Sequence, residues 1–142
     1  MYEPTALDPR QAKQYSPLSL AFLGDAVYEQ QIREKLMLEA NMPVRRLHAL
    51  AVRYVCASFQ AKAAEALLPL FSEEEADIYR RGRNCTSNTV PRSADPADYH
   101  RATGLEALFG YLHLTGNCGR VRELAGLIWS MDAKGEDVCG KS

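Results

Sequence analysis

Apolar residues recur at helical spacing along most of the chain, and prolines mark where the segments begin. Ser16 and Pro17 have the pattern of a helix cap followed by the first helical position, and residues 18–39 then contain no proline. A first turn accepts proline, whereas a helix interior does not. Pro43 therefore predicts the start of a second helix, which the apolar pattern carries to about Leu68.

A capping signal opens the next helix. Ser72 with Glu75 three residues later has the pattern of a capping box, which predicts a shorter helix through Arg81. Gly82 is suited to end this helix in a left-handed conformation. Residues 83–94 are then expected to form a loop.

The same combination of cap and proline recurs at residues 95–96. It predicts a helix from about residue 97 to residue 114, which the glycine-containing cluster at residues 116–119 interrupts. A last helix is expected over about residues 120–133. Because no alternating run of apolar and polar residues is bounded by hairpin signals, the chain is predicted to be all-α, with five or six helices.

Length and composition favour one ordinary globular domain, expected to cover residues 1–142. Of the 142 residues, 46% are hydrophobic and 25% are charged, as in typical folded proteins. No stretch approaches the roughly 20 apolar residues of a bilayer span, and the N-terminus lacks an apolar signal region. We expect a cytoplasmic protein without membrane contact. The net charge of −1 means that any polyanion must be bound by a local patch.

Two carboxylates lie alone among apolar residues of predicted helices. Asp25 is within the segment FLGDAV, and Glu106 is within the segment LEALFG. A buried, unpaired carboxylate costs free energy, so each acid needs a hydrogen-bond partner, a cation or a shifted pKa. Two such acids favour a shared cation. Mg²⁺ fits, because it takes one or two carboxylates and leaves positions for water and phosphate.

Simpler explanations for these two acids remain open. Either carboxylate can reach solvent at a helix edge, or pair with an arginine such as Arg33 or Arg101. Gly24 and Gly104 lower helix propensity next to the acids, which indicates a close backbone approach there. Such an approach would bring the two helices together, and Gly110 supports it more weakly.

Basic side chains are concentrated in two segments. Residues 80–93 carry four arginines and no acid, and the predicted helix after Pro43 is also basic. Arginine forks match phosphate oxygens, and such contacts give affinity without base specificity. The helix dipole also accounts for Arg80 and Arg81, but not for residues beyond Gly82. The candidate polyanion-binding residues are Arg45, Arg46, His48, Arg81, Arg83, Asn84 and Arg92.

Other enzyme classes find no support in the sequence. Motifs for dinucleotide binding, phosphate-loop hydrolysis, zinc proteases and serine hydrolases do not occur. The cysteines are scattered without the spacing of a zinc site.

Three blocks together resemble the ribonuclease III catalytic domain, and specifically its short bacterial branch, the Mini-ribonucleases III. The blocks are FLGDAVYE (22–29), RRGRN (80–84) and LEALFGYL (105–112). The resemblance implies an all-helical, homodimeric endoribonuclease that cuts double-stranded RNA with Mg²⁺ and leaves 5′-phosphates. The substrate expected for this branch is precursor large-subunit ribosomal RNA, with a ribosomal protein as a further candidate partner.

The resemblance assigns roles by position. Asp25 and Glu106 match the family's metal-binding acids, whereas Ala21 and Thr103 stand where larger relatives carry two more. The resemblance thus implies two carboxylate ligands for each site instead of four. Phe22 matches a residue that packs across the dimer, although an aromatic residue in the chain's own core fits the sequence equally well.

The resemblance to the short branch also implies that the C-terminal double-stranded-RNA-binding domain of larger relatives is absent, so the catalytic domain is expected to hold RNA alone. We hypothesise that Asp25 and Glu106 hold Mg²⁺, which activates water for attack on the phosphate. Glu29 is a candidate for orienting that water, or a solvated surface acid. The alternative function is a non-catalytic RNA-binding or ribosome-assembly protein. A histidine-aspartate phosphohydrolase is weaker, because no His-Asp dipeptide occurs.

Overall fold

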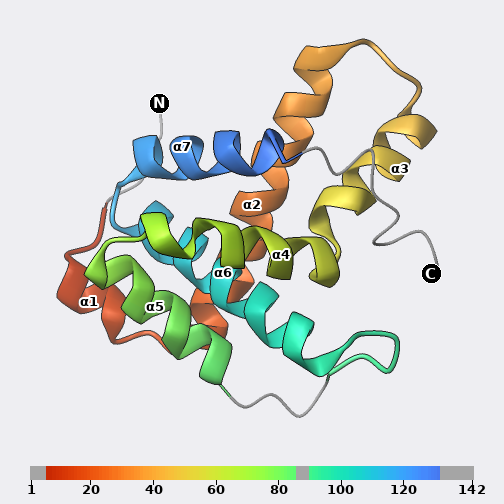
Figure 1. Ribbon diagram of the computed structural model, residues 1–142. Helices are drawn as coiled ribbons and strands as arrows, with labels where there is room; N and C mark the ends of the chain where they lie inside the picture. Colours follow the sequence, from red (N-terminus) through yellow and green to blue (C-terminus); the bar gives the residue numbers. More distant parts are fainter. Residues whose placement is uncertain (1–5, 86–89, 132–142) are drawn as a thin grey trace.

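The computed structural model describes residues 6–85 and 90–131, which are helical without any strand (Figure 1). This agrees with the all-α prediction. The elements are α1 (Pro9–Lys13), α2 (Pro17–Glu39), α3 (Val44–Val55), α4 (Ala57–Leu67), the 3₁₀ turn η1 (Leu68–Leu70), α5 (Glu73–Asn84), α6 (Pro96–Leu114) and α7 (Cys118–Trp129). Within the described ranges no helix has both the length and the apolar character that crossing a bilayer demands.

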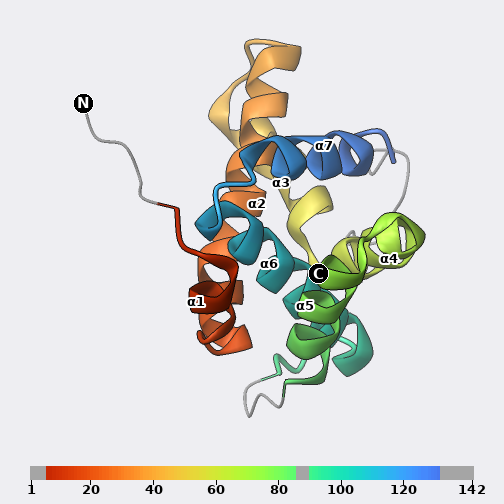
Figure 2. The same ribbon diagram turned by 90° about the vertical axis from the view of Figure 1, so that its left-hand side faces the viewer.

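Helix α6 forms the centre of the fold. It packs against α2, α4 and α5, and these three helices surround it in two perpendicular views (Figures 1 and 2). Its middle, residues 102–112, is buried at every position except Glu106, which is half-buried. A helix that is apolar on all sides belongs in a core. Glu106 is thus an acid in the middle of a buried helix.

Close packing between α2 and α6 depends on Gly24 and Gly110. A β-carbon on Gly24 would overlap the Glu106 carbonyl oxygen, and one on Gly110 would overlap the Leu20 carbonyl. The predicted approach of the two helices is therefore correct at these glycines. Gly104 serves a different contact, because its β-carbon would lie 2.7 Å from the carbonyl oxygen of Tyr79 in α5.

The single helix predicted from Pro43 to Leu68 is wrong. The chain leaves the helical conformation at Cys56, where φ is −70° and ψ is 154°, and this residue divides α3 from α4. Tyr54 on one side of the break packs edge-on against Phe59 on the other, with ring centroids 5.3 Å apart. This aromatic packing stabilises a bend that no proline or glycine signals in the sequence.

Helix α5 confirms the capping box but corrects the position of its end. The Ser72 hydroxyl accepts from the Glu75 amide, and the Glu75 carboxylate accepts from the Ser72 amide. The helix then continues through Asn84, so Gly82 is helical and is no left-handed cap. Its role is contact with α6, because a β-carbon there would lie 2.8 Å from that of Ala107.

The remaining boundaries agree with the prediction except at α1 and at α7, which begins at Cys118 and ends at Trp129, before the end predicted at about residue 133. Helix α1 follows Asp8 and Pro9, the same cap and proline signal that occurs at residues 95–96, and its capping box includes Gln11. Together with the break at Cys56, it accounts for the larger number of helices. Gly116, with φ of +79°, ends α6 as expected. Of the loop predicted over residues 83–94, residues 86–89 lie outside the described part, as do residues 132–133 of the last helix.

Candidate active site

The structure brings together the two acids that the sequence singled out. Asp25, at the exposed edge of α2, and Glu106, half-buried in α6, are joined by a hydrogen bond between their side-chain carboxyl groups. The close approach of the two helices at Gly24 produces this contact, because Gly24 precedes Asp25 and lies against the Glu106 backbone. The pair is far apart in sequence but adjacent in space.

Burial and like charge shift both acids toward their protonated forms. Burial of the Glu106 carboxyl group, followed by repulsion from Asp25, raises its pKa to about 8. Burial also raises the pKa of Asp25, with a further contribution from the charge of Glu29. Two carboxylates this close resist ionising together unless a cation lies between them. The arrangement therefore suits a divalent cation.

The arginines proposed as partners for these acids are engaged elsewhere. Arg33 pairs with Glu29 one turn earlier on α2, at 2.5 Å between Nη2 and Oε2. Arg101 pairs with Glu65 at 3.1 Å and with Asp98 at 3.8 Å. Neither arginine is thus a partner of Asp25 or Glu106. The other simple explanation, that an acid reaches solvent at a helix edge, holds for Asp25, which is exposed, but not for Glu106, which is half-buried.

Glu29 contributes charge to the site rather than a free carboxylate. Its Oε2 accepts from both Nε and Nη2 of Arg33. Its negative charge nevertheless raises the pKa of Asp25 and that of Glu106. The ion pair holds the Glu29 carboxylate in place, and the two roles considered for it, orienting a water and being a solvated surface acid, stay predictions.

Gln60 contacts the site, and the sequence pattern did not identify it. Its Nε2 donates to the Glu106 Oε2 at 3.2 Å and to the Val55 carbonyl oxygen at 2.9 Å. This hydrogen bond opposes the rise of the Glu106 pKa. The signal that was present is an amide between Phe59 and Ala61 on an otherwise alanine-rich helix, where a buried polar group requires partners.

The positions where larger relatives carry two more acids are closed to solvent. Ala21 and Thr103 are buried, and the Thr103 hydroxyl donates to the Tyr99 carbonyl oxygen at 3.0 Å. In the part of the chain that the structure describes, no group of three or more His, Cys, Asp or Glu side chains converges. The site thus offers two carboxylates, a number that suits Mg²⁺ when phosphates and waters complete its shell.

A cavity of about 290 Å³ adjoins the buried acid. Its lining includes Glu106, Gln60 and Thr103, and it extends to Tyr99 and to three residues that precede α6: Pro91, Ser93 and Ala94. The segment between α5 and α6 therefore reaches the same region as the carboxyl pair.

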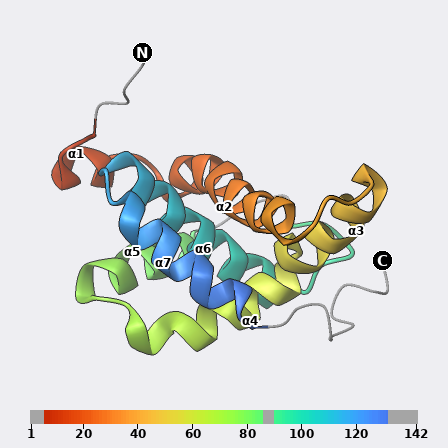
Figure 3. The same cartoon turned by 90° about the horizontal axis from the view of Figure 1, so that it is seen from above.

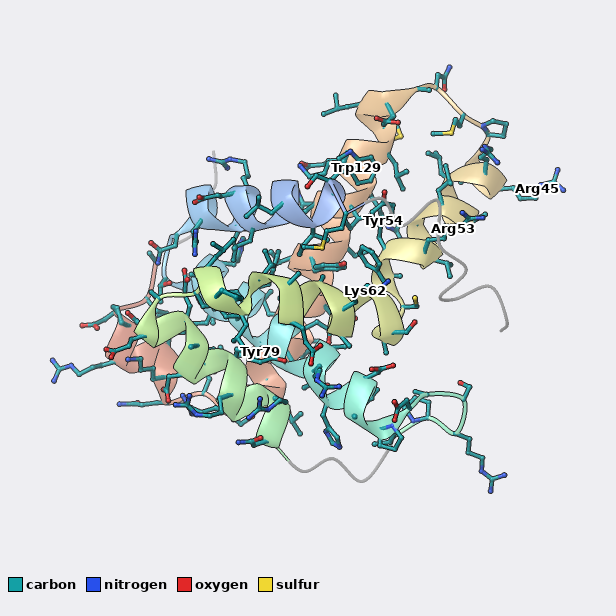
Figure 4. The ribbon with its side chains drawn as sticks, in the orientation of Figure 1. Arg45, Arg53, Tyr54, Lys62, Tyr79 and Trp129 are labelled. Carbon is teal, nitrogen blue, oxygen red and sulfur yellow. The ribbon has the colours of Figure 1, made fainter. Side chains whose placement is uncertain are left out.

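The basic residues predicted on the second helix are exposed near the start of α3. Arg45, Arg46 and His48 all lie in the first turns of this helix. Figure 4 shows Arg45 pointing away from the body of the molecule, with Arg53 further along the same helix. This end of α3 is therefore open to a polyanion.

The second basic group is more constrained than its sequence indicates. Arg83 and Asn84 form the last turn of α5, so the expectation that they lie beyond the helix is wrong. Arg83 lies over the Tyr79 ring, 5.8 Å from its centroid, and Arg81 donates to the Lys13 carbonyl oxygen at 3.3 Å. Arg92 is exposed before α6.

The two basic groups are separate in space. The start of α3 and the end of α5 lie apart in three perpendicular views (Figures 1, 2 and 3). A polyanion that contacts both groups must therefore extend across the molecule.

Phe22 is on the surface, so its interpretation as an aromatic residue of the chain's own core is wrong. It is 85% exposed, although it lies only three residues before Asp25 on α2. Leu18 and Met37 on the same helix are also exposed, as is the neighbouring Leu38. Leu18 lies one turn before Phe22 on the same face of the helix, and neighbouring exposed apolar side chains favour an interaction surface.

Comparison with known proteins identifies close relatives. The family model described as the ribonuclease III domain matches residues 18–117. A Mini-ribonuclease 3 from Thermoanaerobacter is 50% identical over 77% of this chain and 77% of its own length. A Mini-ribonuclease 3 from Enterococcus faecalis is 42% identical over 89% of this chain and 96% of its own.

A solved structure agrees with these relationships. A crystal structure of a Fusobacterium nucleatum protein superimposes with a TM-score of 0.75 at 30% sequence identity, covering 83% of this chain and 94% of that one. The matched region of the family model includes both acids of the carboxyl pair.

Proposed function

The chain belongs to the ribonuclease III family and to its Mini-ribonuclease 3 branch, and from this premise we propose that it cuts double-stranded RNA at the Asp25–Glu106 pair with the help of Mg²⁺. It is an endoribonuclease of that family. The proposed substrate is precursor large-subunit ribosomal RNA, trimmed at its ends in the cytoplasm. The proposed products carry 5′-phosphates.

One observation carries the assignment of the site. Two carboxyl groups from different helices meet at the surface and share a hydrogen bond, although repulsion opposes their joint ionisation. A structural role alone would be served better by apolar side chains, because a pair of neighbouring acids is costly without a cation. The pair is therefore best explained as a binding site for a divalent cation.

The residues of the site have different proposed roles. Asp25 and Glu106 would bind Mg²⁺ directly or through water, and Gly24 keeps their helices close enough for both to reach it. When bound, Mg²⁺ supplies Lewis-acid chemistry that activates water and offsets charge on the phosphate. Glu29 adds negative charge beside the pair while Arg33 holds it in place.

Affinity for RNA is proposed to come from the two basic groups on α3 and α5. A duplex is long enough to reach both, and contacts with its phosphates give binding that depends on shape and salt. Exposed side chains offer such contacts at Arg45, Arg46 and His48, and at Arg92 before α6. Arg81, Arg83 and Asn84 are proposed contacts at the end of α5.

We further propose that two chains associate through the exposed apolar side chains of α2. Phe22 is the most exposed aromatic residue in the described ranges. A two-fold dimer presents one carboxyl pair to each strand of a duplex, which allows a staggered double-strand cut. A ribosomal protein that presents the precursor RNA remains a candidate third partner.

The test of cleavage compares a long RNA duplex with single-stranded RNA of the same sequence, each incubated with the protein in Mg²⁺ and in excess EDTA. We expect 5′-phosphorylated fragments from the duplex in Mg²⁺ alone. Binding of the duplex without any product in Mg²⁺ would favour the alternative of a non-catalytic RNA-binding protein. Cleavage of nucleotides but not of the duplex would favour a phosphohydrolase.

A further inference from the structure

Gln60 has a buried side-chain amide in which the nitrogen forms hydrogen bonds and the oxygen does not. The residue is 2% exposed, and its Nε2 donates to both the Val55 carbonyl and the Glu106 carboxyl group. Its Oε1 is buried and accepts no hydrogen bond from any residue that the structure describes. Leaving a buried polar atom unpaired costs free energy. The residue is therefore not explained by stability alone.

The orientation of this amide is determined by chemistry. The Val55 carbonyl oxygen only accepts hydrogen bonds, so the amino group of Gln60 must face it. The same amino group reaches Glu106 Oε2 at 3.2 Å. Exchanging the nitrogen and the oxygen would place Oε1 against the Val55 carbonyl oxygen, which cannot donate. Val55 thus directs a donor toward the acid.

The break between α3 and α4 makes the Val55 carbonyl available. The last carbonyl groups of a helix have no partner within it, and α3 ends at Val55. Gln60 lies one turn into α4, where its own amide nitrogen donates to the Cys56 carbonyl oxygen at 3.0 Å. A continuous helix would direct the Val55 carbonyl to the amide of residue 59. The bend therefore supplies the second anchor of Gln60.

We propose that Gln60 is a positioning residue that holds the Glu106 side chain in the orientation in which it meets Asp25 around a divalent cation. This inference rests on the proposed function of the carboxyl pair. The proposal assigns no cation ligand to Gln60, which acts through Glu106. Two carboxylates provide little geometric constraint on an ion, so a neighbour that fixes one of them matters more here than in a site with four acids. Hydrogen-bond partners of metal ligands typically contribute about 10-fold to 100-fold in metal affinity or activity.

The test measures Mn²⁺ binding to the full chain without RNA, by electron paramagnetic resonance of free Mn²⁺. Gln60→Met keeps the side-chain length but removes the donor, and Gln60→Leu serves if the methionine variant does not fold. We expect Mn²⁺ binding weakened about tenfold or more, with duplex RNA binding in EDTA within twofold of the unchanged protein. Mn²⁺ affinity within twofold of the unchanged protein would overturn the proposal.

Two further variants separate positioning from loss of stability. Ile78→Val shortens a buried side chain of α5 that does not line the cavity beside Glu106, and we expect it to lower stability without altering Mn²⁺ affinity. Equal weakening in this variant would contradict the role of Gln60. In a Glu106→Gln background, Gln60→Met should cause no further loss of Mn²⁺ binding, because its effect passes through Glu106. An additional tenfold loss there would overturn the proposal.

The same measurements distinguish the inference from the function on which it rests. If the unchanged protein neither binds Mn²⁺ nor cuts the duplex, the carboxyl pair is no metal site and both fail. If the unchanged protein binds Mn²⁺ and Glu106→Gln binds it more weakly, but Gln60→Met binds it normally, only the inference about Gln60 is wrong.

Discussion

The backbone of Gly24 lies directly against the main-chain carbonyl of Glu106, where a side chain of any size would overlap that oxygen. Gly24, which immediately precedes Asp25, is therefore in contact with the peptide group of Glu106. The separation of the two carboxyl groups depends on this packing more than on either side chain. The contact made by Gly24 can therefore be tested by measuring stability, without measuring RNA cleavage.

Gly24→Ala is expected to lower the free energy of unfolding by about 3 kcal/mol or more, because the added methyl group forces α2 away from α6. Urea denaturation followed by circular dichroism measures this change. Gly126→Ala is the matched control: it lies in α7, and a β-carbon there has open space among the described residues. We expect that substitution to stabilise the protein by about 0.5–1 kcal/mol. Similar stability of the two variants would contradict the close contact.

Asp25→Asn and Glu106→Gln should each lower the rate of duplex cleavage by roughly a hundredfold or more, since charge compensation by a cation contributes several kcal/mol to such reactions. Each substitution keeps the shape of the side chain. The circular dichroism spectrum and the molar mass in solution should therefore be unchanged. Cleavage by either variant at the normal rate in Mg²⁺ would exclude that residue from the site.

Stability without a divalent cation should fall as the pH rises from about 5 to about 8. Glu106 has a pKa near 8 in the folded protein and an ordinary value of 4.5 when unfolded. Between these values the folded chain keeps a proton that the unfolded chain has released, so rising pH favours unfolding by at most about 1.4 kcal/mol per pH unit. Urea titrations in EDTA across this range measure the slope.

Glu106→Gln is the control for this pH dependence, because it has no proton to lose at that position. Its unfolding free energy should vary less between pH 5 and pH 8 than that of the unchanged protein. Identical slopes would contradict the raised pKa of Glu106.

Arg45→Ala should weaken binding to duplexes of different sequence about equally. The slope of log affinity against log salt concentration should decrease by about 0.9 for each phosphate that the variant no longer neutralises. Filter binding or fluorescence anisotropy in EDTA, at several salt concentrations, measures both effects. Arg122→Ala, an exposed arginine of α7 outside both basic groups, should leave the slope unchanged. Equal effects of the two substitutions would show that general charge, and not the start of α3, attracts the RNA.

Phe22→Glu should convert a dimer into a monomer in sedimentation velocity, because it places a charge in the proposed apolar interface. The monomer should remain folded, since the Phe22 side chain is 85% exposed. Leu127→Glu, a partly exposed leucine of α7, serves as the control and should not alter the mass. A dimer that persists in the Phe22 variant would place the interface elsewhere.

Features that depend on local sequence were predictable, whereas those that depend on distant contacts were not. Asp25 and Glu106 were identifiable because an acid among apolar helical residues requires a partner. The break at Cys56 was not, since it follows from packing of Tyr54 and Phe59, which the linear pattern does not contain. Gly82 was misassigned for the same reason: its proximity to α6, and not a helix end, accounts for the glycine.

The role of Gln60 at the site also depends on a distant contact and was not predictable from the sequence. A lone glutamine on a helix has many uses in proteins, and only the meeting of α4 with α6 gives this one its partner. The prediction of an ion pair with Arg33 or Arg101 failed because nearer acids hold both arginines.

The burial of α6 affects how members of this family can be identified from their sequences. In the block LEALFGYL, every residue apart from Glu106 lies in the interior. Packing in the core restricts the residue types at those other positions, whether or not the protein is catalytically active. A chain that had exchanged its acid for a neutral residue would retain the rest of the signature, so a search for the block alone would retrieve inactive descendants together with working nucleases.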